Sequence, residues 1–238
     1  MAANRENREE SAKRPAIRVW DAPTRLFHWA LVALVAVSVF TGKTGGMAVM
    51  DWHMRAGFAV LALVLFRIVW GFAGSRRSRF ADFLRGPGAV IAHLRALIRR
   101  EPPHEIGHNP AGGWVVMVLL LLLGVQAGTG LFANDDIFTE GPLAAKVAKS
   151  LSDTLTGIHH LAGTALLVLI GLHVAAVAFY RLWRGEDLVR PMLTGRKTRP
   201  GGMTEDEATH ADAPFAPLWR AALIMALAAA AVWWVVGL

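Results

Sequence analysis

The sequence predicts an all-α membrane protein, in which four transmembrane helices form a bundle and an additional transmembrane helix follows at the C-terminus. Two observations predict this fold class. Hydrophobic residues make up 54% of the 238-residue chain, more than an ordinary soluble domain contains. Five apolar stretches also approach or exceed the ~20 residues that one helical crossing of a bilayer requires. They are residues 26–42, 53–71, 114–132, 158–183 and 218–238.

Basic residues between these stretches predict which helix ends face the cytoplasm. The formal net charge is +7, but the basic residues lack the stacking aromatics of a nucleic-acid groove, so we expect no nucleic-acid partner. Arginine and lysine gather in segments 1–25, 75–110 and 181–220. The loops on the other side hold only Lys43, Lys146 and Lys149. By the positive-inside rule, the N-terminus is cytoplasmic and the C-terminus lies outside.

The chain is predicted to divide into four parts. Residues 1–16 are polar and of mixed charge, no secretory cleavage site follows the first apolar stretch, and we expect a disordered cytosolic tail. Residues 17–198 form the membrane domain with its four-helix bundle. Residues 199–217 are rich in charge, glycine and proline, which predicts a linker. Residues 218–238 are the fifth transmembrane helix, an appendage to the four-helix unit.

Two polar connections join the predicted spans. In residues 75–110, the sequence Gly86-Pro87-Gly88 breaks the segment once, and apolar residues between positions 89 and 98 lie opposite arginines, which predicts an amphipathic helix on the membrane surface. Asn109 and Pro110 predict the N-cap and first position of the third span. The acidic outer segment 134–153 either folds over the bundle or meets a soluble partner.

Cysteine is absent from the chain. This excludes disulfides, iron–sulfur clusters, cysteine-based zinc sites and the covalent attachment of c-type haem. Any haem is therefore held without a covalent bond, and histidine is the residue type to search.

Four of the nine histidines are spaced so that they predict two ligand sites at different depths of the bundle. His159 and His173 are 14 positions apart, which at ~100° per residue brings both to one helix face with a rise of ~21 Å. That rise fits sites near opposite edges of a ~30 Å hydrocarbon layer. His28 begins the first span on the cytoplasmic side, and His53 opens the second on the outer side. The predicted pairs, His28 with His173 and His53 with His159, would each ligate one haem b.

The remaining histidines are expected to have other roles. His160 is 13 positions from His173, which rotates it ~140° away from the ligand face, so we exclude it as the main ligand. Polar connections contain four more histidines, for which solvated or capping roles are expected: His93, His104, His108 and His210.

Arginines and glycines in the spans extend the predicted haem sites. Arg67 follows His53 by 14 positions and returns to its face at the inner depth; it either pairs with a propionate of the inner haem or extends to the cytoplasmic interface. Arg55 is assigned the same role at the outer haem. Three glycines near the ligands either leave room for a macrocycle or serve ordinary helix packing: Gly57, Gly163 and Gly171.

Over roughly residues 18–198 the chain resembles the bacterial cytochrome b561 family, which is related to the b-type cytochrome subunits of nickel-iron hydrogenases. The motifs that carry this resemblance are Arg18-Val19-Trp20-Asp21-Ala22-Pro23-Thr24-Arg25-Leu26-Phe27-His28-Trp29, Phe66-Arg67-Ile68-Val69-Trp70-Gly71-Phe72, Gly74-Ser75-Arg76, Gly107-His108-Asn109-Pro110-Ala111-Gly112, Leu172-His173-Val174 and the segment from Glu186 to Lys197.

The resemblance implies a four-helix bundle in the bacterial inner membrane with two bis-histidine haems, carried here to His28, His53, His159 and His173. It also implies electron exchange with membrane quinone. The chain departs from the family in its fifth span, which leaves partner and quaternary structure open. It also departs in having His160 where an acidic residue is common, which leaves a second choice of ligand open.

The predicted function is therefore that of a di-haem b-type membrane cytochrome, carrying single electrons between a periplasmic or membrane partner and the quinone pool. Two axial imidazoles leave no open iron position, so we expect electron relay and assign no catalytic residue. Three partners stay open: dehydrogenase or hydrogenase subunits, a periplasmic c-type cytochrome, or superoxide, in which case the chain is a stand-alone oxidase that reduces quinone. The acidic outer loop favours a protein partner, because like charge repels superoxide.

Two functions from other classes are alternatives to electron transfer. A histidine-based metal-ion transporter would need carboxylates in the spans and broken helices at mid-membrane, whereas the five apolar stretches contain no acidic residue. A scaffold without redox chemistry would leave the matched histidines unexplained.

Overall fold

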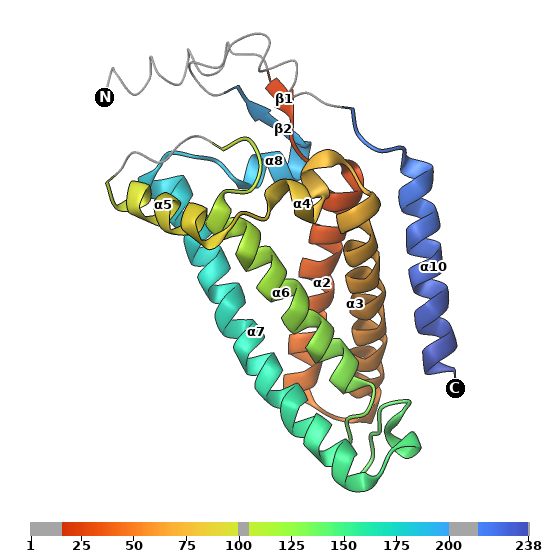
Figure 1. Ribbon diagram of the computed structural model, residues 1–238. Coiled ribbons are helices and arrows are strands. Elements are labelled where there is room, and N and C mark those ends of the chain that lie inside the picture. Colours follow the sequence, from red (N-terminus) through yellow and green to blue (C-terminus); the bar gives the residue numbers. More distant parts are fainter. Residues whose placement is uncertain (1–15, 100–104, 200–213, 238) are drawn as a thin grey trace. The chain divides into compact units, whose positions relative to one another are not determined.

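Nearly all the elements of the protein are helices, and the computed structural model describes residues 16–99, 105–199 and 214–237 (Figure 1). Five helices are long and apolar enough to cross a membrane: α2 (Ala22–Thr44), α3 (Met47–Ala73), α6 (Pro110–Gly130), α7 (Lys149–Trp183) and α10 (Leu218–Val236). The predicted all-α class with five spans is thus confirmed. The expected tail, up to residue 15, and most of the expected linker, residues 200–213, lie outside the described residues.

Two helices begin well before the apolar stretches that predicted them. Helix α3 begins at Met47 rather than His53, and α7 begins at Lys149 rather than Ile158. The added turns of α7 are rich in polar side chains, so hydropathy does not reveal them. The added turns of α3 are largely apolar, with Asp51 as the polar side chain, so this reason does not apply to them. Asn109 caps α6 as predicted, because its side-chain oxygen accepts the Gly112 N–H at 2.6 Å.

Shorter elements lie between the long helices. They are β1 (Ala16–Arg18), η1 (Arg76–Ser78), α4 (Phe80–Phe83), α5 (Pro87–Ile98), η2 (Ala144–Lys146), α8 (Val189–Thr194) and β2 (Arg196–Thr198). The chain divides into two compact units, whose boundaries fall inside α2, α3, α6 and α7. Unit 1 comprises Met1–Arg25, Gly71–Trp114 and Ala176–Ala216, and unit 2 comprises Leu26–Trp70, Val115–Ala175 and Pro217–Leu238.

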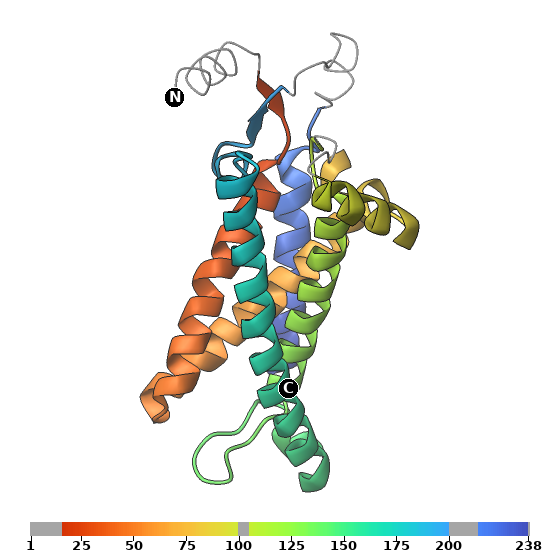
Figure 2. The same cartoon turned by 90° about the vertical axis from the view of Figure 1, so that its left-hand side faces the viewer.

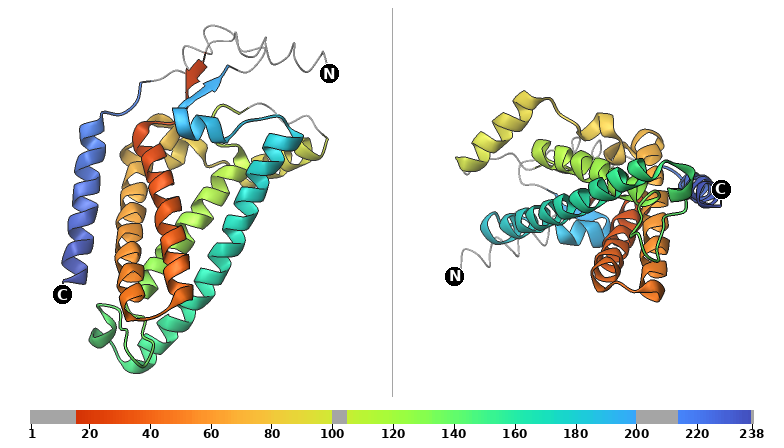
Figure 3. Two further views of the ribbon diagram at one scale, coloured as in Figure 1. Left: turned by 180° about the vertical axis from the view of Figure 1, so that it is seen from behind. Right: turned by 90° about the horizontal axis from the view of Figure 1, so that it is seen from below.

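Unit 2 is a bundle in which α2, α3, α6 and α7 run alternately up and down (Figures 1 and 2). Helix α3 is its most enclosed member: half of its most apolar segment is buried, against 6% for α2. The exposed apolar faces of the other helices suit contact with lipid. Helix α10 lies beside α3 on the outside of the four (Figure 3), and its buried residues Ala221, Ala228 and Val232 share one face.

Unit 1 is held by a small apolar core and a two-stranded sheet. Strand β1 pairs antiparallel with β2, with Ile17 opposite Lys197. Ile17, Val19 and Trp20 are buried together, and Ile106 and Met192 pack against them. The start and the end of the predicted membrane domain are therefore joined within unit 1. Ala16, which was assigned to the tail, instead begins β1.

A buried polar network fixes the start of α2 in unit 1. Asp21 is 1% exposed, and one of its carboxylate oxygens accepts the Thr24 N–H at 2.8 Å, as an N-cap does. Its other oxygen accepts the Ser78 hydroxyl at 3.1 Å, and the Thr24 and Ser78 hydroxyls lie 2.7 Å apart. The Asp21-Ala22-Pro23-Thr24 motif thus joins the beginning of α2 to η1.

Helix α5 occupies the place of the predicted amphipathic helix. It begins at Pro87, with Gly86 as its N-cap, so the Gly-Pro-Gly sequence starts a helix instead of interrupting one. Ile91, Leu94 and Ile98 are exposed, as expected for the apolar face of a helix that lies on lipid.

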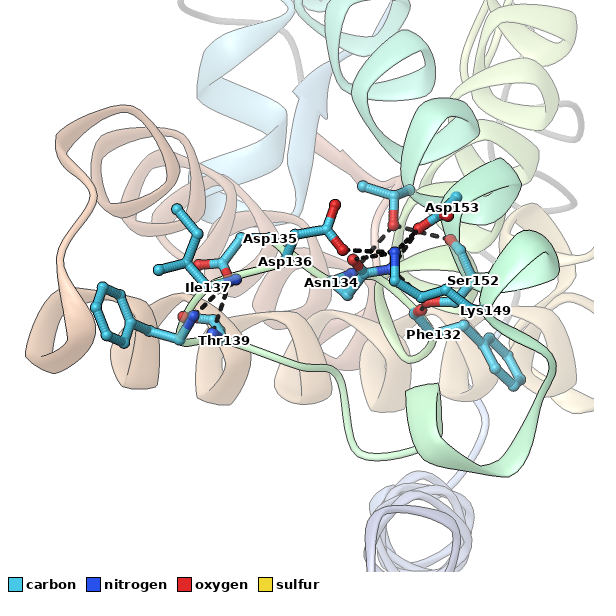
Figure 4. Close-up of polar contacts among 11 residues, drawn as sticks. Phe132, Asn134, Asp135, Asp136, Ile137, Thr139, Lys149, Ser152 and Asp153 are labelled. Carbon is cyan, nitrogen blue, oxygen red and sulfur yellow. Dashed lines mark hydrogen bonds and ion pairs between the residues drawn. The ribbon is translucent and has the colours of Figure 1, made fainter.

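The loop between α6 and α7 is held by polar contacts at one end of unit 2 (Figure 4). The Asp135 carboxylate accepts the backbone N–H groups of Thr139, Ile137 and Phe138, and these hydrogen bonds lower its pKa from 3.8 to about 2. Lys149 forms ion pairs with Asp136 and Asp153. These contacts leave the Ile137 and Phe138 side chains about three-quarters exposed, at 74% and 75%.

Candidate functional site

His53 of α3 and His159 of α7 lie together in unit 2, as the spacing predicted. Their ring centroids are 6.2 Å apart, with the ring planes at 79°. Nδ1 of His53 lies 2.9 Å from the Ser38 carbonyl oxygen, and Nδ1 of His159 lies 2.9 Å from that of Gln126. Because a carbonyl only accepts, each Nδ1 carries the proton, and Nε2 of each neutral ring keeps its lone pair.

The separation of these rings fits ligation of one metal ion from opposite sides. An imidazole nitrogen lies about 2 Å from a metal that it binds, and the ring centre lies roughly 1 Å further, so two opposed rings have centres about 6 Å apart. The observed 6.2 Å agrees with this spacing. Nε2 of His159 accepts the Gln126 side-chain N–H at 3.1 Å, which shows that its lone pair is available for a donor or a metal.

The number of protein ligands suits haem better than a bare metal ion. Within residues 16–99, 105–199 and 214–237, no group of three or more His, Asp and Glu side chains could hold a metal ion. Haem needs only two axial ligands, because the porphyrin supplies the other nitrogens. The residues present therefore fit haem b.

His28 of α2 and His173 of α7 form the second predicted pair in unit 2. Both side chains are half-buried. Nδ1 of His28 is buried and has no hydrogen-bond partner among the described residues. A buried polar atom without a protein partner is unusual, and it is expected where a bound group completes the site.

The two predicted arginines lie in different surroundings. Arg67 is 3% exposed, and its neighbours Phe66 and Trp70 in α3 are also buried, with stacked rings 5.8 Å apart. Its guanidinium is enclosed by protein rather than extended to the surface, which favours the pairing with an anion over the interfacial role. Arg55 is exposed, and its guanidinium lies 5.8 Å from the ring centroid of Trp52.

The other residues near the predicted ligands separate into two groups. A Cβ atom on Gly57 or Gly171 would meet no described atom within 4 Å, so open space adjoins both, whereas one on Gly163 would lie 3.3 Å from the Gln126 amide nitrogen. His160 is exposed, in agreement with its exclusion from the ligand face.

A buried cluster in unit 1 corrects the roles expected for His93 and His108. His93 is 5% exposed rather than solvated. Asn109 donates to the Tyr180 hydroxyl at 3.0 Å, which leaves that hydroxyl free to donate to Nε2 of His93 at 3.1 Å. His108 packs between the rings of Trp20 and Phe83, at 4.6 and 4.7 Å. The signal in the sequence that could have indicated this cluster is Tyr180, the one tyrosine of the chain.

Known proteins similar to this chain are membrane cytochromes. The chain is 25% identical over 230 residues to a probable Ni/Fe-hydrogenase B-type cytochrome subunit of Rhodobacter capsulatus, a match covering 82% of this chain and 87% of that protein. The protein of the same description from Bradyrhizobium diazoefficiens is 25% identical over 79% of this chain and 89% of its own length. The probable Ni/Fe-hydrogenase 1 B-type cytochrome subunit of Escherichia coli K12 is 28% identical over a match that covers 44% of this chain and 57% of that protein.

No solved structure matches the chain significantly. The family model of prokaryotic cytochrome b561 matches residues 19–195, a range that contains both histidine pairs and the motifs around them. The chain therefore belongs to the prokaryotic cytochrome b561 family, and it is a multi-pass membrane cytochrome of the b type that carries haem b and transfers electrons.

Proposed function

We propose that the chain carries single electrons between a protein partner at the outer membrane face and the quinone pool, through two haem b groups. The outer group is held by His53 and His159, and the inner one by His28 and His173. The observation that carries the proposal is the outer pair, whose ring centroids lie 6.2 Å apart with each Nδ1 engaged by a backbone carbonyl.

The residues of the chain prepare each site for electron relay. The Nδ1–H···O=C bonds of His53 and His159 fix the ring orientation and increase the basicity of the ligating nitrogens. Arg67 supplies a buried positive charge for a propionate of the inner group. Bound haem supplies an iron that changes by one electron without needing an open coordination position.

The distribution of charge supports one orientation in the membrane. Residues 17–198 form the di-haem domain, with the N-terminus cytoplasmic and the C-terminus periplasmic, because basic residues gather in the segments assigned to the inside. This orientation puts the Asp135 loop and the His53/His159 pair at the periplasmic side.

A hydrogenase is the partner that the relatives favour. The matched proteins are described as probable Ni/Fe-hydrogenase B-type cytochrome subunits. Oxidation of H₂ would release two protons and two electrons. The two electrons pass through the chain one at a time, and a quinone takes both with two protons to give a quinol. The acidic outer loop supports a protein donor over superoxide, which like charge would repel.

The first test is a reduced-minus-oxidised optical spectrum of the purified chain, with haem quantified per polypeptide. We expect a b-type signal and two haems per chain. Protein without a b-type signal after haem-replete expression would overturn the proposal, and a single haem would remove the inner or the outer site from it.

The second test identifies the donor. Quinone reduction is measured with membranes that contain the chain, using H₂ plus the cognate hydrogenase, a reduced c-type cytochrome or a superoxide source. We expect reduction with H₂ that disappears in the His53→Ala variant. Reduction with superoxide alone would show that the chain acts as an oxidase instead.

A further inference from the structure

Helices α2 and α6 contain the same six-residue pattern at the place where each meets an outer histidine. The pattern is V-x-x-x-T-G, at residues 37–42 in α2 and 125–130 in α6. In α2 the Thr41 hydroxyl donates to the Val37 and Ser38 carbonyls, at 2.7 and 3.2 Å. In α6 the equivalent Thr129 hydroxyl donates to the equivalent carbonyls at the same two distances.

Each pattern receives one imidazole in the same way. His53 bonds through Nδ1 to the carbonyl at the second position of the α2 pattern, and His159 bonds to the carbonyl at the second position of the α6 pattern, both at 2.9 Å. The threonine oxygens lie 3.3 and 3.5 Å from the same Nδ1 atoms. Three distances are therefore identical in two helix pairs that are far apart in sequence, and a fourth differs by 0.2 Å.

The glycine that ends each pattern makes room for the ring. A Cβ atom on Gly42 would lie 3.0 Å from Cε1 of His53, and one on Gly130 would lie 2.9 Å from Cε1 of His159. The contact at Gly130 is shorter than real Cβ atoms show, and the contact at Gly42 is tighter than most of them. Each ring would have to move away from the helix, which would weaken the hydrogen bond from Nδ1 to the carbonyl.

The carbonyl in each pattern accepts from its own helix as well as from the imidazole. A helical carbonyl accepts the N–H of the residue four positions later, which here is the glycine itself, and the threonine hydroxyl is a second, longer donor at 3.2 Å. The imidazole N–H lies closer than that hydroxyl, at 2.9 Å, and it reaches the oxygen from the side of the helix where the glycine leaves a gap. The carbonyl, threonine and glycine therefore act as one receptor for an N–H group.

We propose that this pattern is an imidazole seat, used twice, that positions the two axial ligands of the outer haem and does not serve the inner one. The inference rests on the proposed function, because it concerns the ligands assigned there. The inner level is built differently: Nδ1 of His28 has no partner in the described residues, and the position 14 after His53 is Arg67, whereas the position 14 after His159 is His173.

The test substitutes each glycine and measures haem per chain in purified protein. Gly42→Ala and Gly130→Ala are each expected to lower the haem content from two to one, with the inner haem retained. Gly128→Ala is the matched control in α6, since a Cβ there would meet no described atom within 4 Å, and it should keep both haems. Alanine favours helix over glycine, so a weakened helix cannot explain a selective loss.

A second measurement does not depend on the tolerance of the glycine positions. Thr41→Val and Thr129→Val keep the side-chain shape but remove the hydroxyl, and each is expected to shift the midpoint potential of the outer haem in the same direction, while Thr41→Ser and Thr129→Ser restore it. Wild-type protein without haem would refute the proposed function. Wild-type protein with two haems, together with alanine and valine variants that keep both haems and both potentials, would refute the seat alone.

Discussion

The outer histidines show how a residue acquires the orientation of a ligand from atoms on other helices. His53 and His159 are each held through Nδ1 by a backbone carbonyl of the preceding helix. His160, next in sequence to His159, is exposed. Adjacent histidines therefore differ in their surroundings, because helix geometry turns one of them inward.

The first prediction at the residue scale concerns this contrast. His53→Ala and His159→Ala should each lower the haem content by one per chain, because one axial ligand is lost, whereas His160→Ala should leave it unchanged. Haem quantification against protein concentration checks both. If only the His160 variant lost haem, His160 would be the ligand and the assignment of His159 would be wrong.

The second prediction at this scale concerns Gly195, which ends α8 with φ at +79°. A Cβ there would lie 2.7 Å from the Trp20 carbonyl oxygen. Gly195→Ala should lower the free energy of unfolding by about 2 to 3 kcal/mol, from backbone strain together with this collision. Gly185 also has positive φ but open space around it, so Gly185→Ala should cost only about 1 kcal/mol. Thermal unfolding in detergent compares the two variants. Equal losses of stability would show that the collision with the Trp20 carbonyl has no effect.

At the scale of elements, the sequence predicted the apolar helices that span the lipid, and it missed features that depend on contacts between segments. The five apolar stretches located every spanning helix, and Asn109-Pro110 located the start of α6. The first turns of α7 were missed, because polar residues there are stabilised by loop contacts such as those of Lys149. The burial of His93 was missed because its partner Tyr180 is far away in sequence.

The Tyr180 hydroxyl should hold α5 against the end of α7. Tyr180→Phe removes the hydroxyl and leaves Asn109 and His93 without a shared partner, so unit 1 should lose about 1 to 3 kcal/mol of stability. Trypsin should then cleave faster at Arg95 and Arg99. Thr164→Val removes a hydroxyl of α7 that bonds within the helix and serves as the control; equal cleavage of the two variants would contradict the role of Tyr180.

The Asp135 loop should lose its order in acid. Its carboxylate has a lowered pKa, about 2 in the folded chain against 3.8 ordinarily, so its stabilising contribution is present above pH 3.8 and is lost as the pH falls through about 2. At pH 4, pepsin should cleave Asp135→Ala near Phe138 faster than wild type. The difference should vanish near pH 2; a difference that persists there would show that ionisation is not the cause.

At the scale of the whole molecule, the sequence predicted the fold class, because it follows from helical periodicity and membrane thickness. It did not predict that β1 and β2 would pair, since two three-residue strands carry too weak a pattern. It also gave no reason to single out Gly42 and Gly130, because glycine is common in membrane helices. Their importance appears only when the facing imidazole is in place.

The β1·β2 pairing makes a prediction about the fifth helix. Since the first and last segments of residues 16–198 are already joined, a chain that ends after Thr198 should keep two haems and their midpoint potentials. Optical redox titration of the truncated and full-length proteins checks this. Loss of a haem would show that α10 supports the bundle directly.

The repeated V-x-x-x-T-G pattern divides the proposed outer site equally between two helical hairpins. The α2–α3 hairpin supplies one pattern and His53, and the α6–α7 hairpin supplies the other pattern and His159. The proposed inner site is not divided in this way, because Arg67 occupies the position in the first hairpin that His173 occupies in the second. Substitutions at equivalent positions of the two hairpins should therefore have similar effects on the outer site and different effects on the inner one.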